Sequence, residues 1–105
     1  MKTKIFCDIA DYKTIKFFNN KSYVDGFTTN PSLMRLAGAK NYKEYSLKIL
    51  KICKKKPISF EVFGDNSQDM LNQAYEINSW GKNVYVKIPV VNSRGFFTGS
   101  VIEEL

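Results

Sequence analysis

The chain contains no histidine among its 105 residues. Without an imidazole it cannot build a Ser-His-Asp triad, a Cys-His pair or a histidine general base, and it lacks the ligand that most zinc sites use. Any catalysis must therefore use lysine, carboxylate, hydroxyl or amide groups. A chain of 105 residues, of which 44% are hydrophobic, suits one modest globular domain.

Cysteine is scarce and long apolar runs are absent. Cys7 and Cys53 have no C-x-x-C spacing, so we expect free thiols rather than a disulfide. No apolar run approaches the roughly 20 residues of a membrane span. Asp8 interrupts the first apolar run too early for a signal-peptide core. We therefore expect a cytoplasmic protein with no membrane partner.

Lysine supplies most of the charge, and the formal net charge is +6. The densest cluster is "KICKKK", residues 51–56. A nucleic-acid-binding surface would place arginine and aromatic side chains among these lysines. Here the lysines close a predicted helix, where they favour the negative end of its dipole. We interpret the cluster as a solvated helix end and expect no nucleic-acid partner.

Strand and helix patterns alternate along the chain. Strands joined by helical crossovers pair in parallel, which predicts an α/β fold, either a (β/α) barrel or a doubly wound sheet. No G-x-G-x-x-G or G-x-x-x-x-G-K motif follows a strand, so a dinucleotide or P-loop fold has no support. The predicted strands are 4–8, 22–29, 57–63 and 83–90, and the predicted helices are 12–19, 31–37, 41–56, 66–80 and one beginning at 100.

Each predicted strand carries a polar residue in or just after its C-terminal half. The carboxyl ends of parallel strands meet on one side, where ligand sites form. Strand alternation also places Glu61 with Ser59, and Lys87 with Tyr85, on a mixed face that suits a barrel interior. The candidate site residues are Asp8, Thr28, Thr29, Asn30, Glu61 and Lys87.

These residue types suit carbonyl chemistry. A partly dry cavity favours the neutral amine of a lysine. A neutral Lys87 would attack a carbonyl and form a Schiff base. The iminium withdraws electrons, so the carbon–carbon bond beyond the adjacent carbon can break. A carboxylate, either Asp8 or Glu61, must then take the hydroxyl proton and return it.

Each residue also has a purely structural interpretation. Asp8 can cap the helix that follows it, and Glu61 and Lys87 can pair as a buried salt bridge. Asn30 can be the N-cap of the next helix, with its side chain folded onto the amide of Ser32 or Leu33. We favour a site, because polar residues recur at four consecutive strand ends. We expect the Asn30 side chain to face Lys87 and bind substrate hydroxyls.

Four stretches resemble the transaldolase family, and the short transaldolases and fructose-6-phosphate aldolases are the most similar. The resemblance implies a parallel (β/α)8 barrel of TIM type that uses no metal and no cofactor. Only the first four β/α units are present, so residues 1–105 would be the N-terminal half of a single barrel domain. The matching stretches are "IFCDIAD" (5–11), "DGFTTNPSLM" (25–34), "VYVKIPV" (84–90) and "GFFTG" (95–99).

The resemblance implies catalytic roles. Lys87 would form a Schiff base with a ketose phosphate of the fructose 6-phosphate or sedoheptulose 7-phosphate type, and Asp8 would be the acid/base of carbon–carbon cleavage. Glu61 would position a catalytic water. The aldolase branch tends to have glutamine there, so Glu61 favours transfer of a dihydroxyacetone unit to an aldose phosphate, as in the pentose phosphate pathway. The alternatives are an aldolase-type lyase and an inactive fragment that only binds.

The resemblance also implies the partners. Asn30 would hydrogen-bond the three-carbon unit on the lysine, with Thr28 and Thr29 in the same substrate site, and phosphorylated sugars would be the ligands. Ile9 departs from the usual threonine or serine. A whole barrel takes about 200 residues, so the phosphate site and a second water-holding residue would lie in the absent half. We expect a fragment, and a homo-oligomer if residues 1–105 stand alone; a degenerate gene product is the other alternative.

Overall fold

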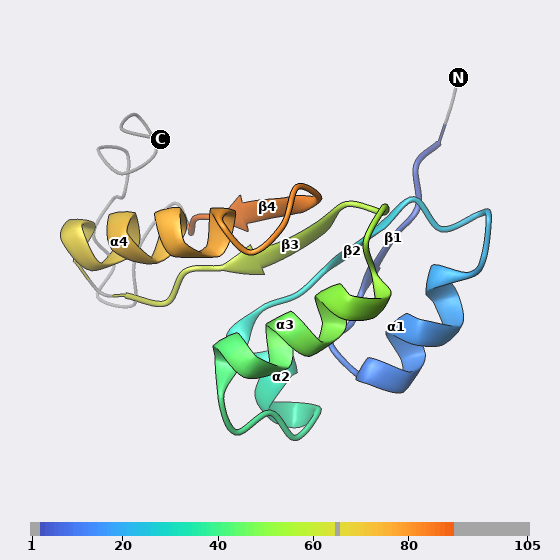
Figure 1. Cartoon of the computed structure of the whole chain (residues 1–105), viewed down its shortest axis with the longest axis horizontal. Helices are drawn as coiled ribbons and strands as arrows, with labels where there is room; N and C mark the ends of the chain where they lie inside the picture. The colour runs from blue at the N-terminus through green and yellow to red at the C-terminus, as the bar shows by residue number, and fades with distance from the viewer. Residues whose placement is uncertain (1–2, 65, 90–105) are drawn as a thin grey trace.

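A computed structural model of the protein describes residues 3–64 and 66–89 (Figure 1). Strands and helices alternate, and two helices, α2 and α3, follow the second strand. The elements in chain order are β1 (Phe6–Asp8), α1 (Tyr12–Asn19), β2 (Gly26–Thr28), α2 (Pro31–Leu36), α3 (Tyr42–Ile52), β3 (Ile58–Glu61), α4 (Ser67–Asn78) and β4 (Val84–Lys87).

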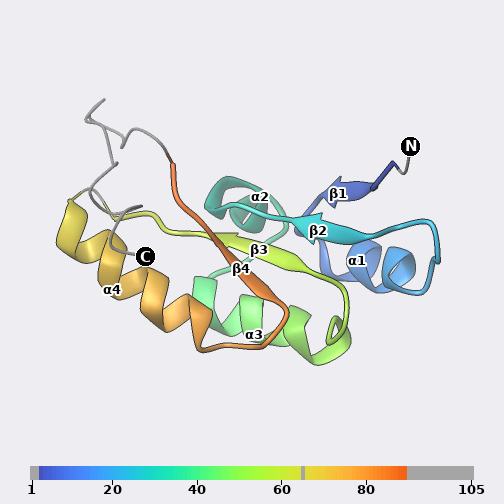
Figure 2. The same ribbon diagram turned by 90° about the horizontal axis from the view of Figure 1, so that it is seen from above.

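The four strands form one parallel sheet in the order β1-β2-β3-β4. The order in space is thus the order in sequence, as in a (β/α) barrel. A doubly wound sheet reverses its order at a switch point, and no reversal occurs among the described strands. Figure 2 shows β4 turned relative to β2, the twist expected of such a sheet. The α/β prediction is confirmed, and the sheet has the arrangement of the first units of a TIM-type barrel.

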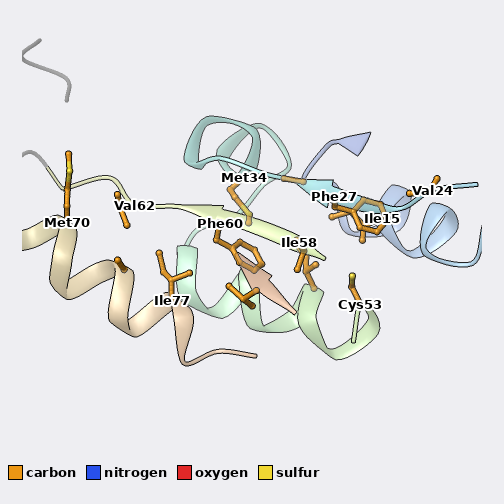
Figure 3. Close-up of a cluster of buried hydrophobic side chains, with 14 residues drawn as sticks. Ile15, Val24, Phe27, Met34, Cys53, Ile58, Phe60, Val62, Met70 and Ile77 are labelled. Atoms are coloured by element: carbon orange, nitrogen blue, oxygen red, sulfur yellow. The ribbon is translucent and has the colours of Figure 1, made fainter. Parts of the chain in front are cut away.

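One face of the sheet carries the hydrophobic core. Phe27, Ile58 and Phe60 are almost wholly buried on this face. They pack with side chains from all four described helices, including Ile15, Met34, Ile49 and Met70 (Figure 3). Each large side chain buried in this way contributes about 1.5–3 kcal/mol relative to exposure. The helices therefore cover the aliphatic face that strand alternation predicts.

The helices begin where the sequence predicts. Asp11, Asn30, Asn41 and Asn66 are N-caps, and each side chain accepts a hydrogen bond from an amide three residues later. Such caps satisfy amides that have no partner within the helix. Gly38 ends the α2 segment with a φ of 93°, in the left-handed region that favours glycine.

The end of α3 differs from the prediction. The helix stops at Ile52, so most of the lysine cluster lies beyond it. Lys56 is not solvated as expected, because its ammonium donates to the carbonyl oxygens of Lys21, at 2.5 Å, and Phe18, at 3.5 Å. Lys54 and Lys55 are exposed. The cluster therefore contains one lysine that joins two loops.

Cys7 and Cys53 are free, and burial raises the pKa of the Cys53 thiol to about 11. Within residues 3–64 and 66–89, no helix is long and apolar enough to cross a membrane, and no cluster of metal-binding side chains occurs. The predicted "GFFTG" loop and the helix beginning at 100 lie outside the described residues.

Candidate active site

The side of the sheet opposite the core is open. Side chains on it alternate with the buried ones, as the sequence predicts. Phe6 and Tyr85 are 49% and 63% exposed on this side. The open face consists of Phe6, Asp8, Thr28, Ser59, Glu61, Tyr85 and Lys87. It is not the partly dry cavity that the sequence pattern predicts, because no helix or second sheet among the described elements covers it, although the Ser59 hydroxyl oxygen is buried between its neighbours.

Asp8 and Thr28 form a pair on this face. They are direct partners in the β1–β2 register, and the Thr28 hydroxyl donates a 2.7 Å hydrogen bond to Asp8 Oδ1. The α1 helix is capped by Asp11, whose side chain accepts from the amide of Thr14. The structural interpretation of Asp8 as a helix cap is therefore wrong. Its carboxylate is held on the open face by a neighbouring hydroxyl.

Glu61 and Lys87 form a second pair, on the neighbouring strands β3 and β4. They are direct partners in the β3–β4 register, with 3.8 Å between Lys87 Nζ and Glu61 Oε1. The two side chains, Lys87 and Glu61, are 47% and 23% exposed, so the alternative of a buried salt bridge is wrong. An ion pair this exposed contributes about 0–1 kcal/mol. Stability alone therefore gives little reason for the pairing.

Asn30 uses its carboxamide oxygen as a helix cap. The oxygen accepts a 2.8 Å hydrogen bond from the amide of Leu33, as in the structural interpretation of this residue. The capping interpretation is therefore correct for this side chain, and the expectation that the whole side chain is free to bind substrate is wrong. The Nδ2 group makes no hydrogen bond within the described part of the chain. The Asn30 oxygen is therefore used in capping, and its Nδ2 group remains available as a donor.

Thr29 faces the core and not the open face. Its side chain is fully buried, and its hydroxyl donates a 2.7 Å hydrogen bond to the carbonyl of Ser59. A hydroxyl in this position cannot touch a ligand on the opposite side of the sheet. The prediction that Thr29 binds substrate is therefore not supported by its placement, and its role here is to join β2 to β3.

A model of the family described as "Transaldolase/Fructose-6-phosphate aldolase" matches residues 5–96. The chain belongs to this family. It is 40% identical over 87 residues to a probable transaldolase of Streptococcus agalactiae serotype V, with 83% of this chain covered. It is 40% identical over 89 residues to a probable transaldolase of Methanococcus maripaludis, with the same coverage. A probable transaldolase of Thermoplasma volcanium is 41% identical over 91 residues, with 85% covered.

The chain spans about 40% of the length of these curated transaldolase relatives. The matched region includes every one of the candidate residues, from Asp8 to Lys87. All residues of the open face therefore lie within the region that matches the transaldolase/aldolase family. The activity of a complete protein belongs to the proposals below.

One residue of this transaldolase-family chain is not among the candidates that the sequence pattern indicates. Tyr42 is the first residue of α3, and its ring is partly buried against the hydrophobic core. Its hydroxyl, however, accepts a 3.0 Å hydrogen bond from the Glu61 amide and donates one of 3.0 Å to the Glu61 carbonyl. Burial raises the pKa of Tyr42 to about 12. No periodicity reveals this contact, because it depends on where β2 ends beside β3.

Proposed function

We propose that the chain carries the Schiff-base part of a transaldolase. The observation that supports this proposal most is the placement of Asp8, Thr28, Glu61 and Lys87 on one face at the carboxyl ends of four parallel strands. An amine and two carboxylates lie on that face, with 3.8 Å between Lys87 Nζ and Glu61 Oε1. These groups suit chemistry on a carbonyl substrate and need no metal ion.

The proposed reaction begins at Lys87. Its neutral amine adds to the carbonyl carbon of a ketose phosphate, such as fructose 6-phosphate or sedoheptulose 7-phosphate, and loss of water with the uptake of one proton from solvent gives an iminium. Asp8 takes the proton of the hydroxyl one carbon beyond the adjacent carbon. The carbon–carbon bond breaks toward the iminium, which becomes an enamine, and an aldose phosphate leaves. The Thr28 hydroxyl orients Asp8 for this step.

The second half of the reaction reverses the first. The enamine carbon attacks the aldehyde of an acceptor aldose phosphate, Asp8 returns the proton to the new alkoxide, and water releases the new ketose from Lys87. We propose that Glu61 holds that water. This transfer of a dihydroxyacetone unit is the transaldolase step of the pentose phosphate pathway. That residues 1–105 are half of one barrel domain stays a prediction.

Borohydride trapping tests the Schiff base. The native chain that contains residues 1–105 is incubated with fructose 6-phosphate and reduced, and peptides are examined by mass spectrometry. We expect a reduced dihydroxyacetone adduct on Lys87. Lys43 is the matched control, because it also pairs with a carboxylate, Glu76, at 3.1 Å. Lys87→Met should abolish the adduct and Lys43→Met should not, while binding without any adduct would contradict the proposal.

The same material separates transfer from lyase activity, since the family name includes both branches. With an acceptor aldose phosphate present, a transferase makes a new ketose and an aldolase releases free dihydroxyacetone. We expect the new ketose. Replacing the carboxylate in Glu61→Gln should shift the products toward free dihydroxyacetone, if Glu61 holds the water. A product ratio that Glu61→Gln leaves unchanged would remove Glu61 from the mechanism.

A further inference from the structure

The hydroxyl of Tyr42 bonds to the Glu61 backbone at a point where β2 has already ended. The β2–β3 pairing runs through Thr28 and Ser59, and the amide of Thr29 still donates to the Ser59 carbonyl at 3.2 Å. The chain then turns at Asn30 into α2. Further along β3, the amide and carbonyl of Glu61 meet the Tyr42 hydroxyl instead, each at 3.0 Å. One hydroxyl thus supplies the acceptor and the donor that two residues of a continuing parallel strand would supply.

The Tyr42 ring is held firmly enough to act as a fixed partner. Its centroid lies 5.3 Å from that of Phe63, 6.2 Å from that of Trp80 and 6.5 Å from that of Phe60. Aromatic rings at these separations and tilts attract one another beyond their buried area. Only a neutral phenol can donate and accept at once, and burial favours that neutral form further by raising the pKa of Tyr42 to about 12.

The backbone contact has a consequence for the Glu61 side chain. In a strand, the amide and carbonyl lie in the plane of the sheet, and the side chain stands perpendicular to it. Fixing both backbone groups of a residue therefore fixes the direction of its side chain. The Glu61 carboxylate lies on the open face, with Oε1 3.8 Å from Lys87 Nζ. Because β2 ends at Thr28, no β2 residue pairs with Glu61 in the described register.

We propose that Tyr42 is a positioning residue, whose hydroxyl holds the Glu61 backbone so that the carboxylate points toward Lys87. Its effect on the reaction rests on the proposed Schiff-base function. A purely structural alternative is that only the ring matters, as part of the aromatic cluster. Tyr42→Phe separates the two, because it keeps the ring and removes the hydroxyl. Tyr45→Phe is the matched control.

Tyr45→Phe makes the same chemical change as Tyr42→Phe, but at a hydroxyl that does not contact Glu61. Tyr45 is on the same helix, and its hydroxyl also accepts a 3.0 Å hydrogen bond from a backbone amide, that of Tyr12. Tyr12 begins α1, away from Glu61. Both replacements thus remove one hydroxyl from α3. A general loss of stability would follow from either, whereas a change at Glu61 should follow only from Tyr42→Phe.

The first measurement does not depend on activity. Amide hydrogen exchange, followed by NMR, should be about ten-fold faster at Glu61 in Tyr42→Phe, since one net hydrogen bond is worth about that factor. Val62 should change little, because its amide donates to the Lys87 carbonyl at 3.1 Å. Tyr45→Phe should speed exchange at Tyr12 and not at Glu61. Unchanged exchange at Glu61 in Tyr42→Phe would overturn the positioning role.

The second measurement uses the reaction. Tyr42→Phe should lower kcat about ten-fold or more while KM changes little, because misplacing a reacting group costs rate rather than binding. In a Glu61→Gln background the same replacement should have almost no further effect. Equal losses in both backgrounds would show that Tyr42 does not act through Glu61 and would overturn the proposal.

The two failures are distinguishable. If the unmodified protein forms no adduct on Lys87, the proposed function fails, and the catalytic part of this inference fails with it. Hydrogen exchange at the Glu61 amide then still decides whether the Tyr42 hydroxyl holds the Glu61 backbone. If the adduct forms and Tyr42→Phe reacts at the unmodified rate, the function stands and the inference does not.

Discussion

Asn30 carries two functional groups with different partners. Its carboxamide oxygen caps α2 through the Leu33 amide, and its nitrogen makes no hydrogen bond among the described residues. From the sequence, capping and binding are alternative interpretations of this residue. Because the two roles use different atoms of one side chain, a capped helix and a bound substrate are compatible. The capping oxygen also limits rotation of the side chain, which fixes where the nitrogen points.

Two replacements of Asn30 separate these roles. Asn30→Asp keeps an oxygen that caps well, so the free energy of unfolding should stay nearly unchanged, whereas Asn30→Ala should lower it by about 1 kcal/mol. Both remove the donor, so both should slow borohydride trapping with fructose 6-phosphate. Urea unfolding and the trapping rate measure the two effects. If Asn30→Asp is trapped at the unmodified rate, Asn30 acts only as a helix cap and does not bind the substrate.

Individual side chains are predictable where a short-range rule governs them. Glu61 and Lys87 lie on one face, as predicted, because alternation has a period of two residues. The same rule argues against Thr29, which follows Thr28 directly and so points to the other side of the sheet. The contact between Tyr42 and Glu61 spans 19 residues. It requires knowing where a strand ends in space, which the sequence pattern does not contain.

At the scale of elements, helix starts are predicted more accurately than helix ends. The caps Asp11 and Asn66 are local signals, and α1 and α4 begin directly after them. The end of α3 is set from a distance instead. The side-chain amide of Asn83 donates to the carbonyls of Cys53, at 2.8 Å, and Lys56, at 2.9 Å. The sequence pattern predicts a helix through Lys56, but these contacts hold residues 53–56 in a non-helical conformation after α3 ends at Ile52.

Lys56 should stabilise the fold more than its neighbour Lys55 does. Its ammonium donates to the carbonyl of Phe18, in the last turn of α1, and to that of Lys21, just after the helix, whereas Lys55 is exposed. Lys56→Met keeps most of the side chain but leaves these carbonyls without the charged donor. We expect it to lower the free energy of unfolding by about 1–2 kcal/mol. Lys55→Met should change it by less than about 0.5 kcal/mol, and equal effects in denaturant unfolding would contradict this account.

At the scale of the whole molecule, the sheet has two edges available for pairing. Among the described strands, β1 pairs only with β2 and β4 only with β3. An apolar groove of about 600 Å³ lies between α4 and β4, lined by residues that include Ala74, Val84 and Ile88. It lies beside β4, and Lys87 is not among its lining residues. The parallel order was predictable, but the exposure of the open face was not, since strand alternation does not say whether another layer covers a face.

Residues 1–105 on their own should self-associate. Unpaired strand edges and exposed apolar side chains favour contact with another chain. In a two-fold pair of copies, β4 of one could extend the sheet along β1 of the other in the same parallel sense. Analytical ultracentrifugation over a range of concentrations should show a dimer or larger species. A monomer at every concentration would contradict this prediction.

The order β1-β2-β3-β4 has a consequence for how the protein is made. Each strand pairs with the one synthesised just before it, so every new β/α unit can add to an edge that already exists. Paired residues are 20 positions apart between β1 and β2 (6 and 26), 31 between β2 and β3 (27 and 58) and 26 between β3 and β4 (58 and 84), so each pairing closes a loop of only one unit. Synthesis proceeds at about 5–20 residues per second, slowly compared with such steps. The sheet can therefore form progressively on the ribosome, with no unit waiting for a distant partner.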